Sequence, residues 1–170
     1  MDTPKVLIVD DREENLVALE TMLRDMDIEL VRATSGNQAL ALTLEHEFAL
    51  ALVDVQMPDM DGYETVEFMH QEAETELLPV IFVSAVFTEE HHRLKGIESG
   101  AIDFMEKPLN PQILKGKVSM FLKLYRHRRF MQEVNRWLEE KVVEKTASLV
   151  ETNERLQEET EQRIRLEQQM

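Results

Sequence analysis

The sequence predicts a doubly wound α/β fold, in which helices cover both faces of a five-stranded parallel sheet. Short apolar runs alternate with helical patterns along the chain, and the connections between them are short. The runs are continuously apolar rather than alternating with polar residues, which is typical of strands buried on both faces. The expected strands cover residues 5–9, 28–33, 49–53, 79–83 and 101–105.

The segments between these strands carry helix signals. Apolar residues recur at helical spacing from Glu14 to Met26, and the loop at 57–62 carries the Pro and Gly signals of a turn before the third helix. Gly100 fits a helix C-cap, and Pro111 fits the first turn of the last helix. The expected helices cover residues 14–26, 35–47, 63–74, 89–99 and a stretch that begins at Pro111.

The last helix has no evident end. After Pro111 there is no further proline, and from residue 130 the composition shifts to Glu, Gln, Arg, Lys and Leu. At about 1.5 Å per residue, residues 130–170 would extend about 60 Å as a helix. The sequence therefore predicts a long helix and a coiled coil, which we expect to join two chains in parallel.

The seam of this coiled coil is thin. One column has residues exactly one heptad apart, with Arg163 interrupting it: Val142, Leu149, Leu156 and Met170. The second column is either Leu138, Lys145, Thr152, Glu159 and Leu166, or Thr146, Asn153, Thr160 and Glu167. Because both choices are partly polar, an isolated or fraying helix is the alternative to a dimer.

Composition excludes several classes of function. The chain has no cysteine, so disulfides and thiolate metal sites are impossible. Its net charge of −15 argues against nonspecific binding of nucleic acid, which needs a basic face. It has no apolar run near the roughly 20 residues of a membrane span and no signal peptide pattern, so we expect a cytoplasmic protein without membrane insertion.

Polar residues follow four of the expected strands. Asp10 and Asp11 follow the first, Asp54 the third, Ser84 the fourth and Lys107 the fifth. In an open parallel sheet, ligands bind at the edge formed by the carboxyl ends of the strands. Three carboxylates, one hydroxyl and one ammonium at that edge predict a site for a divalent cation and a phosphoryl group.

These residue types suit phosphoryl transfer to a carboxylate. An aspartate that attacks phosphorus needs a cation to neutralise the negative charge of both groups. Mg²⁺ prefers oxygen ligands, which Asp10, Asp11 and Asp54 can supply. The Lys107 ammonium can neutralise a phosphoryl oxygen, and the Ser84 hydroxyl can donate a hydrogen bond to another. The product would be an acyl phosphate.

The chain resembles a response-regulator receiver domain of bacterial two-component signalling, a module with a flavodoxin-like (βα)5 fold. The resemblance covers about residues 4–125, and four motifs in order carry it: residues 6–11, 52–62, 79–85 and 100–108. We therefore expect a receiver domain at 1–125, followed at 126–170 by a long helix that links it to an output domain.

The resemblance implies a role for each site residue. Asp54 would be the phosphoacceptor, and Lys107 would contact the phosphoryl group. Mg²⁺ or Mn²⁺ would be held by Asp10, Asp11, Asp54 and the backbone carbonyl of Gln56, with Asp11 rather than Asp10 as a direct ligand. The phosphodonor would be a histidine kinase, a phosphotransfer protein or a small molecule.

The resemblance also implies a conformational switch. Ser84 matches the hydroxyl that moves toward the phosphate, and Phe104 matches the aromatic ring that turns inward behind it. The family often has threonine and tyrosine at these places. Because Phe104 has no phenolic hydroxyl, any switching here would rest on packing alone. It would alter the face formed by the fourth and fifth helices and the fifth strand.

Residues 138–149 resemble signalling helices that join receivers to C-terminal output domains, and we expect phosphorylation to change a parallel homodimer formed through residues 130–170. One alternative is a stand-alone dimeric receiver that acts as an adaptor or phosphate sink. A second is an aspartate-based phosphohydrolase, but those enzymes carry a second aspartate where this chain has Gln56. Adjacent helical residues diverge, so we interpret His91 and His92 as surface residues rather than a metal pair.

Overall fold

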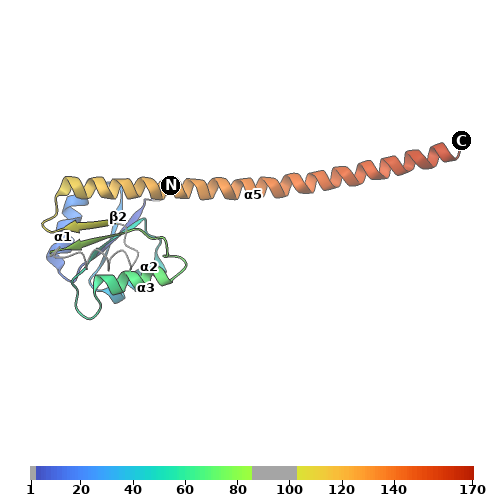
Figure 1. Cartoon of the computed structure of the whole chain (residues 1–170). Coiled ribbons are helices and arrows are strands. Elements are labelled where there is room, and N and C mark those ends of the chain that lie inside the picture. The colour runs from blue at the N-terminus through green and yellow to red at the C-terminus, as the bar shows by residue number, and fades with distance from the viewer. Residues whose placement is uncertain (1–2, 86–102) are drawn as a thin grey trace. The chain divides into compact units, whose positions relative to one another are not determined.

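The computed structural model of the chain describes residues 3–85 and 103–170 (Figure 1). Five parallel strands form one sheet in the order β2-β1-β3-β4-β5, which is the flavodoxin-like order and confirms the predicted fold class. The strands are β1 (Lys5–Val9), β2 (Glu29–Ala33), β3 (Leu50–Asp54), β4 (Val80–Ser84) and β5 (Asp103–Glu106).

The predicted strand ends need a small correction. Asp54 and Ser84 are the last residues of β3 and β4 rather than the first residues after them. The reason is the sheet register, in which Asp54 pairs with Val83 and Ser84 pairs with Glu106, so the ladder continues through both polar residues. Asp10 and Lys107 do follow their strands directly, as predicted.

Local signals in the sequence set the helix starts. The Ser35 side chain caps its helix by accepting a hydrogen bond from the Gln38 amide. Asp61 and Glu64 form a capping box, so the third helix begins at Gly62, one residue before the predicted start. The described helices are α1 (Glu13–Leu23), α2 (Gly36–Glu45), α3 (Gly62–Gln71) and α5 (Pro111–Gln168). The predicted helix at 89–99, its Gly100 cap and the His91-His92 pair lie outside the described residues.

Helices cover both faces of the sheet, as predicted. Neighbouring strand residues point to opposite faces, so Leu7 packs in one core cluster and Ile8 in the other. The first cluster includes Val66 of α3, and the second includes Leu16 of α1 and Leu114 of α5. Around the sheet, α2 and α3 accordingly lie on one side, and α1 and the start of α5 lie on the other (Figure 1). The two layers fix the strand ends that carry the polar residues.

The chain divides into two compact units, residues 1–125 and 126–170. Helix α5 has 58 residues, and all of its buried side chains lie between Leu114 and Leu122. From residue 135 to the end, every side chain is exposed in the single chain. This length fits the predicted coiled coil. Among residues 3–85 and 103–170, no helix contains an apolar stretch long enough to cross a bilayer.

Candidate functional site

Three carboxylates meet at the carboxyl ends of β1 and β3. One oxygen from each of Asp10, Asp11 and Asp54 lies within 4.8 Å of the others. Asp10 and Asp54 are buried, whereas Asp11 is exposed. The parallel pairing of β1 with β3 brings these residues together although more than 40 positions separate Asp11 from Asp54 in the sequence. The structure thus assembles the predicted acidic cluster.

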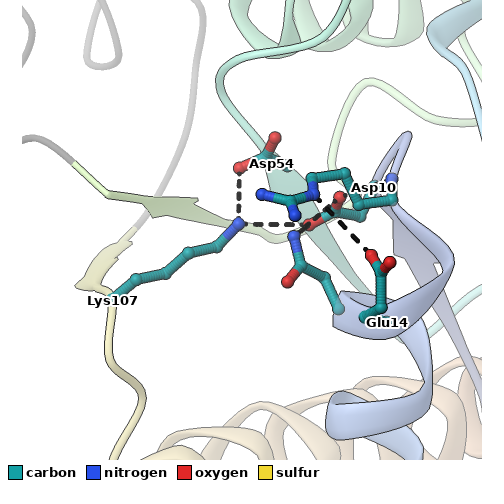
Figure 2. Close-up of polar contacts among 6 residues, drawn as sticks. Asp10, Glu14, Asp54 and Lys107 are labelled. Atoms are coloured by element: carbon teal, nitrogen blue, oxygen red, sulfur yellow. Dashed lines mark hydrogen bonds and ion pairs between the residues drawn. The ribbon is translucent and has the colours of Figure 1, made fainter.

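Lys107 bridges two of these carboxylates (Figure 2). Its Nζ atom donates to Asp54 Oδ1 at 3.0 Å and to Asp10 Oδ2 at 3.1 Å. The main chain anchors this lysine, because its N–H donates to the Ser84 carbonyl at 2.8 Å. The lysine therefore reaches the cluster from β5 and supplies a positive charge at the predicted position.

Asp10 accepts further hydrogen bonds from the start of α1. The Arg12 amide donates to Asp10 Oδ1 at 2.9 Å. The Asn15 side chain presents Nδ2 to Asp10 Oδ1 at 3.0 Å and to Oδ2 at 2.9 Å. Sequence reasoning missed Asn15. The sequence does contain a signal for it. Asn15 carries an amide about one helical turn after Asp10 and Asp11, on a helix that begins at the sheet edge where the carboxylates meet.

The electrostatics of the cluster are dominated by burial and excess negative charge. Burial raises the pKa of Asp54, the hydrogen bond and charge of Lys107 oppose this, and the charges of Asp10 and Asp11 raise it further. Burial lowers the pKa of Lys107, but Asp54 and Asp10 more than offset this, so its pKa is raised overall. One ammonium among three carboxylates leaves a pocket that would gain from another cation.

The loop after β3 approaches the site closely. The Val55 amide donates to the Val83 carbonyl, and the Gly62 amide donates to the Val55 carbonyl. A Cβ atom on Gly62 would lie 2.3 Å from the Asp54 carbonyl oxygen, so only glycine fits there. Asp59 adopts a left-handed backbone with φ of 68°. Gln56 has an exposed side chain in this loop, and the role of its carbonyl stays a prediction.

The two predicted switch residues lie on neighbouring strands. Ser84 is buried at the end of β4, next to the backbone of Lys107. Phe104 on β5 is partly buried, and its ring lies 5.5 Å from the ring of Phe82, the residue that it pairs with across the strands. The structure therefore places Ser84 next to Lys107 and packs Phe104 against Phe82, and the movement of both residues stays a prediction.

A cavity of about 200 Å³ adjoins the cluster. The polar residues that line it are Asp10, Asn15, Asp54 and Lys107. Its other walls are apolar side chains from the strands, from α1 and from the segment after Lys107, such as Leu19, Met22 and Leu109. The phosphoacceptor candidate Asp54 thus borders open space large enough for a phosphoryl group.

Comparison with known proteins identifies the family. Residues 6–119 match the response regulator receiver domain. The chain belongs to this receiver family. The match covers the sheet, the four residues that meet at its edge and the start of α5, and it confirms the resemblance drawn from the four sequence motifs.

Curated proteins of different kinds are similar to this chain over part of their length. A probable cyclic di-GMP phosphodiesterase of Vibrio cholerae is 32% identical over 144 residues, which is 85% of this chain and 32% of that protein. The transcriptional regulatory protein SrrA of Staphylococcus aureus is 32% identical over 119 residues, which is 70% of this chain and 48% of that protein. The chain thus spans only 32% and 48% of the lengths of these two relatives.

Solved structures show the same fold. The chemotaxis protein CheY4 of Vibrio cholerae is 28% identical with a TM-score of 0.67, covering 71% of this chain and 99% of that one. A response regulator described as putative, from Chloroflexus aurantiacus, is 32% identical with a TM-score of 0.67, covering 72% of this chain and 99% of that one. In both comparisons the match spans nearly all of the solved chain.

As a receiver, this protein acts in two-component signalling, in which receivers interact with histidine kinases or phosphotransfer partners. Receiver domains are generally not enzymes, and they bind Mg²⁺ through an acidic pocket. The donor set of this chain fits that cation, because Mg²⁺ prefers oxygen ligands and takes one or two carboxylates while keeping several waters.

Proposed function

We propose that Asp54 accepts a phosphoryl group from a histidine kinase, or from a small phosphodonor, in a Mg²⁺-dependent reaction. The observation that carries this is the buried Asp54 carboxylate, which lies within 4.8 Å of two other carboxylates and 3.0 Å from the Lys107 ammonium. An Asp54 oxygen would bond to phosphorus while the bond from phosphorus to the donor breaks, so the donor leaves with the electron pair of that bond.

The surrounding residues would divide the work. Asp10, Asp11, Asp54 and the Gln56 carbonyl would hold Mg²⁺, which supplies positive charge against the repulsion between the carboxylate and the incoming phosphoryl group. Lys107 would turn from the carboxylates toward a phosphoryl oxygen as a point charge. Ser84, buried at the end of β4, would donate its hydroxyl hydrogen to another oxygen.

Phosphorylation would then act through Ser84 and Phe104. The contact between the rings of Phe104 and Phe82 supports a packing switch, because movement of one ring must repack the other. The proposed change alters β5, the start of α5 and the fourth helix that the sequence predicts at 89–99, outside the described residues. Helix α5 continues into residues 126–170. We propose that these residues form a parallel homodimer in the cytoplasm and control a C-terminal output domain.

Phosphorylation can be tested directly with the full chain. Incubation with acetyl phosphate and Mg²⁺ should add one phosphoryl group, seen in the intact mass, and a chelator should prevent it. Asp54→Asn should abolish the addition. Asp59→Asn is a matched control in the neighbouring loop, because asparagine tolerates the left-handed backbone of Asp59, and it should be labelled normally. Labelling that persists in Asp54→Asn would place the phosphoryl group elsewhere.

The dimer can be tested by light scattering, with and without Mg²⁺ and beryllofluoride as a mimic of the acyl phosphate. A dimer in both states would mean that the signal passes as a change of geometry. A monomer that dimerises only with the mimic would make association itself the switch. A monomer under both conditions, at concentrations well above those in cells, would contradict the proposed dimer.

A further inference from the structure

Asp10 is the most enclosed carboxylate of the acidic cluster, with 2% of its surface exposed. It accepts hydrogen bonds from three donors of different kinds: the backbone amide of Arg12, the side-chain amide of Asn15 and the ammonium of Lys107. The carboxylates of Asp11 and Asp54 lie within 4.8 Å and repel it. The three donors therefore decide where the Asp10 oxygens point.

Two of these donors, Lys107 and Asn15, differ in whether they also contact Asp54. Lys107 is shared with Asp54, so under the proposed function a phosphoryl group on Asp54 competes for its ammonium. Asn15 belongs to α1 and contacts both Asp10 oxygens. Its amide is neutral, so it holds the carboxylate without reducing the negative charge that attracts a divalent cation. Unlike Lys107, Asn15 makes no hydrogen bond to Asp54 within the described residues, so a phosphoryl group there would not compete for its amide.

Asn15 is not a capping residue of α1. A capping asparagine accepts a hydrogen bond from a backbone N–H of the first turn. Here the amide nitrogen Nδ2 donates to both oxygens of the Asp10 carboxyl group. The N-cap position of α1 is Arg12, which makes no side-chain capping hydrogen bond. The orientation of Asn15 is therefore directed at Asp10 rather than at the helix backbone.

We propose that Asn15 is a positioning residue, which acts through Asp10 to set the affinity of the acidic cluster for a divalent cation. This inference rests on the proposed function of the cluster as a metal site. Hydrogen-bond partners of metal-binding carboxylates orient them, and losing such a partner typically weakens metal binding about 10- to 100-fold. Removing the Asn15 amide frees Asp10 to turn away from its two neighbouring carboxylates.

The test measures binding of Mn²⁺ to the full chain, with free Mn²⁺ counted by electron paramagnetic resonance. Asn15→Leu keeps a similar side-chain volume and removes the donor, and it should raise the Mn²⁺ dissociation constant about 10-fold. Asn37→Leu is the matched control, because Asn37 is an exposed asparagine in the first turn of α2. It should bind Mn²⁺ within twofold of the unsubstituted chain.

A double-mutant cycle separates positioning through Asp10 from a general structural role. In the Asp10→Asn background, Asn15→Leu should add no further loss of Mn²⁺ affinity. With acetyl phosphate as donor, Asn15→Leu should need more Mg²⁺ for half-maximal labelling and reach a rate within twofold of normal at saturating Mg²⁺. Thermal unfolding of each variant, measured without metal, checks that the fold is retained.

Two results would overturn the inference. One is Mn²⁺ affinity in Asn15→Leu within twofold of the unsubstituted chain, and the other is an equal loss in both backgrounds. Either result leaves the proposed function intact if the unsubstituted chain binds Mn²⁺ and is labelled at Asp54. If that chain neither binds Mn²⁺ nor accepts a phosphoryl group, the proposed function itself fails, and the role of Asn15 fails with it.

Discussion

The two units of the chain solve different physical problems. Residues 1–125 bury apolar side chains on both faces of a sheet and fix four polar groups at its edge. Residues 126–170 form a helix whose largest apolar side chains are exposed in the single chain, with Leu149 68% and Leu156 51% exposed. The first unit therefore carries its stabilising contacts internally, whereas from residue 135 onward the second unit buries no side chain in the single chain.

The difference indicates where chemistry and association can each occur. Positioning an attacking carboxylate needs neighbours that hold it within a fraction of an ångström, which only a packed unit supplies. A helix with a partly polar seam has a low intrinsic stability, so small changes at its start can alter its pairing. Two pairs of substitutions have one member in each unit, and a third pair compares a crowded with an open position inside the first unit.

The largest expected effect comes from the core. Phe82 is fully buried, and its ring lies 4.8 Å from Tyr63 and 5.5 Å from Phe104. Phe82→Ala should destabilise the first unit by about 3–5 kcal/mol, because it leaves a cavity among these rings. Leu156→Ala, at an exposed position, should change the same unfolding free energy by less than about 0.5 kcal/mol. Urea unfolding followed by tyrosine fluorescence measures both.

Leu156→Ala should instead weaken self-association, seen by light scattering at decreasing protein concentration. If Leu156→Ala lowered the unfolding free energy of the first unit as much as Phe82→Ala did, the second unit would be contributing to the stability of the receiver core. The contrast between the units would then be wrong. Unchanged self-association in Leu156→Ala, together with a loss in Phe82→Ala, would point to a dimer held by the receiver rather than the helix.

A second, smaller effect distinguishes two glycines. A Cβ atom at Gly62 would meet the Asp54 carbonyl oxygen at 2.3 Å, whereas a Cβ atom at Gly116 in α5 would have no neighbour within 4 Å. Gly62→Ala should therefore destabilise the chain by about 1–3 kcal/mol. Gly116→Ala should stabilise it by about 0.5–1 kcal/mol, since alanine favours a helix interior. Thermal unfolding of both variants gives the signs.

Gly62→Ala should also slow labelling of Asp54 by acetyl phosphate, because the backbone that positions this carboxylate must shift. Normal labelling in a destabilised Gly62→Ala chain would show that the strain is relieved on the helix side, away from Asp54. Gly116→Ala should be labelled at the normal rate. A loss of stability in Gly116→Ala would mean that the space around this part of α5 is filled by a partner chain.

The sequence predicts the position of a site residue well where topology alone decides it. Asp10, Asp54 and Lys107 follow from apolar runs that end at one edge of a parallel sheet. The strand ends at Asp54 and Ser84 were missed by one residue, because neighbouring strands and not local composition decide how far a ladder extends. Asn15 was missed because its partner depends on how α1 packs. The coiled-coil seam stays ambiguous because every side chain from residue 135 onward is exposed in the single chain, so no packing selects one column.

The smallest expected effect concerns the charge on Asp54. Burial, first of all, raises the pKa of Asp54 above its usual value despite Lys107, so ionisation of this carboxyl opposes folding. Its contribution to stability is fully present below the unfolded pKa of about 3.9 and is lost as pH rises through the higher folded pKa. Asp54→Asn cannot ionise. Its stability relative to the unsubstituted chain should therefore rise as pH rises from about 4 toward neutrality.

Titration of Lys107 does not contribute to the pH dependence of stability in this range. Its raised pKa keeps it charged from about pH 4 to neutrality. The matched substitution in the second unit is Glu151→Gln, at an exposed position, and its stability should stay within about 0.5 kcal/mol of the unsubstituted chain throughout. Urea unfolding at a series of pH values measures both.

Saturating Mg²⁺ should remove the advantage of Asp54→Asn, since the cation stabilises the ionised carboxylate. An advantage that is equally large at pH 4 and pH 7 would mean that Asp54 is not penalised for its charge, and the electrostatic contrast between the two units would not hold.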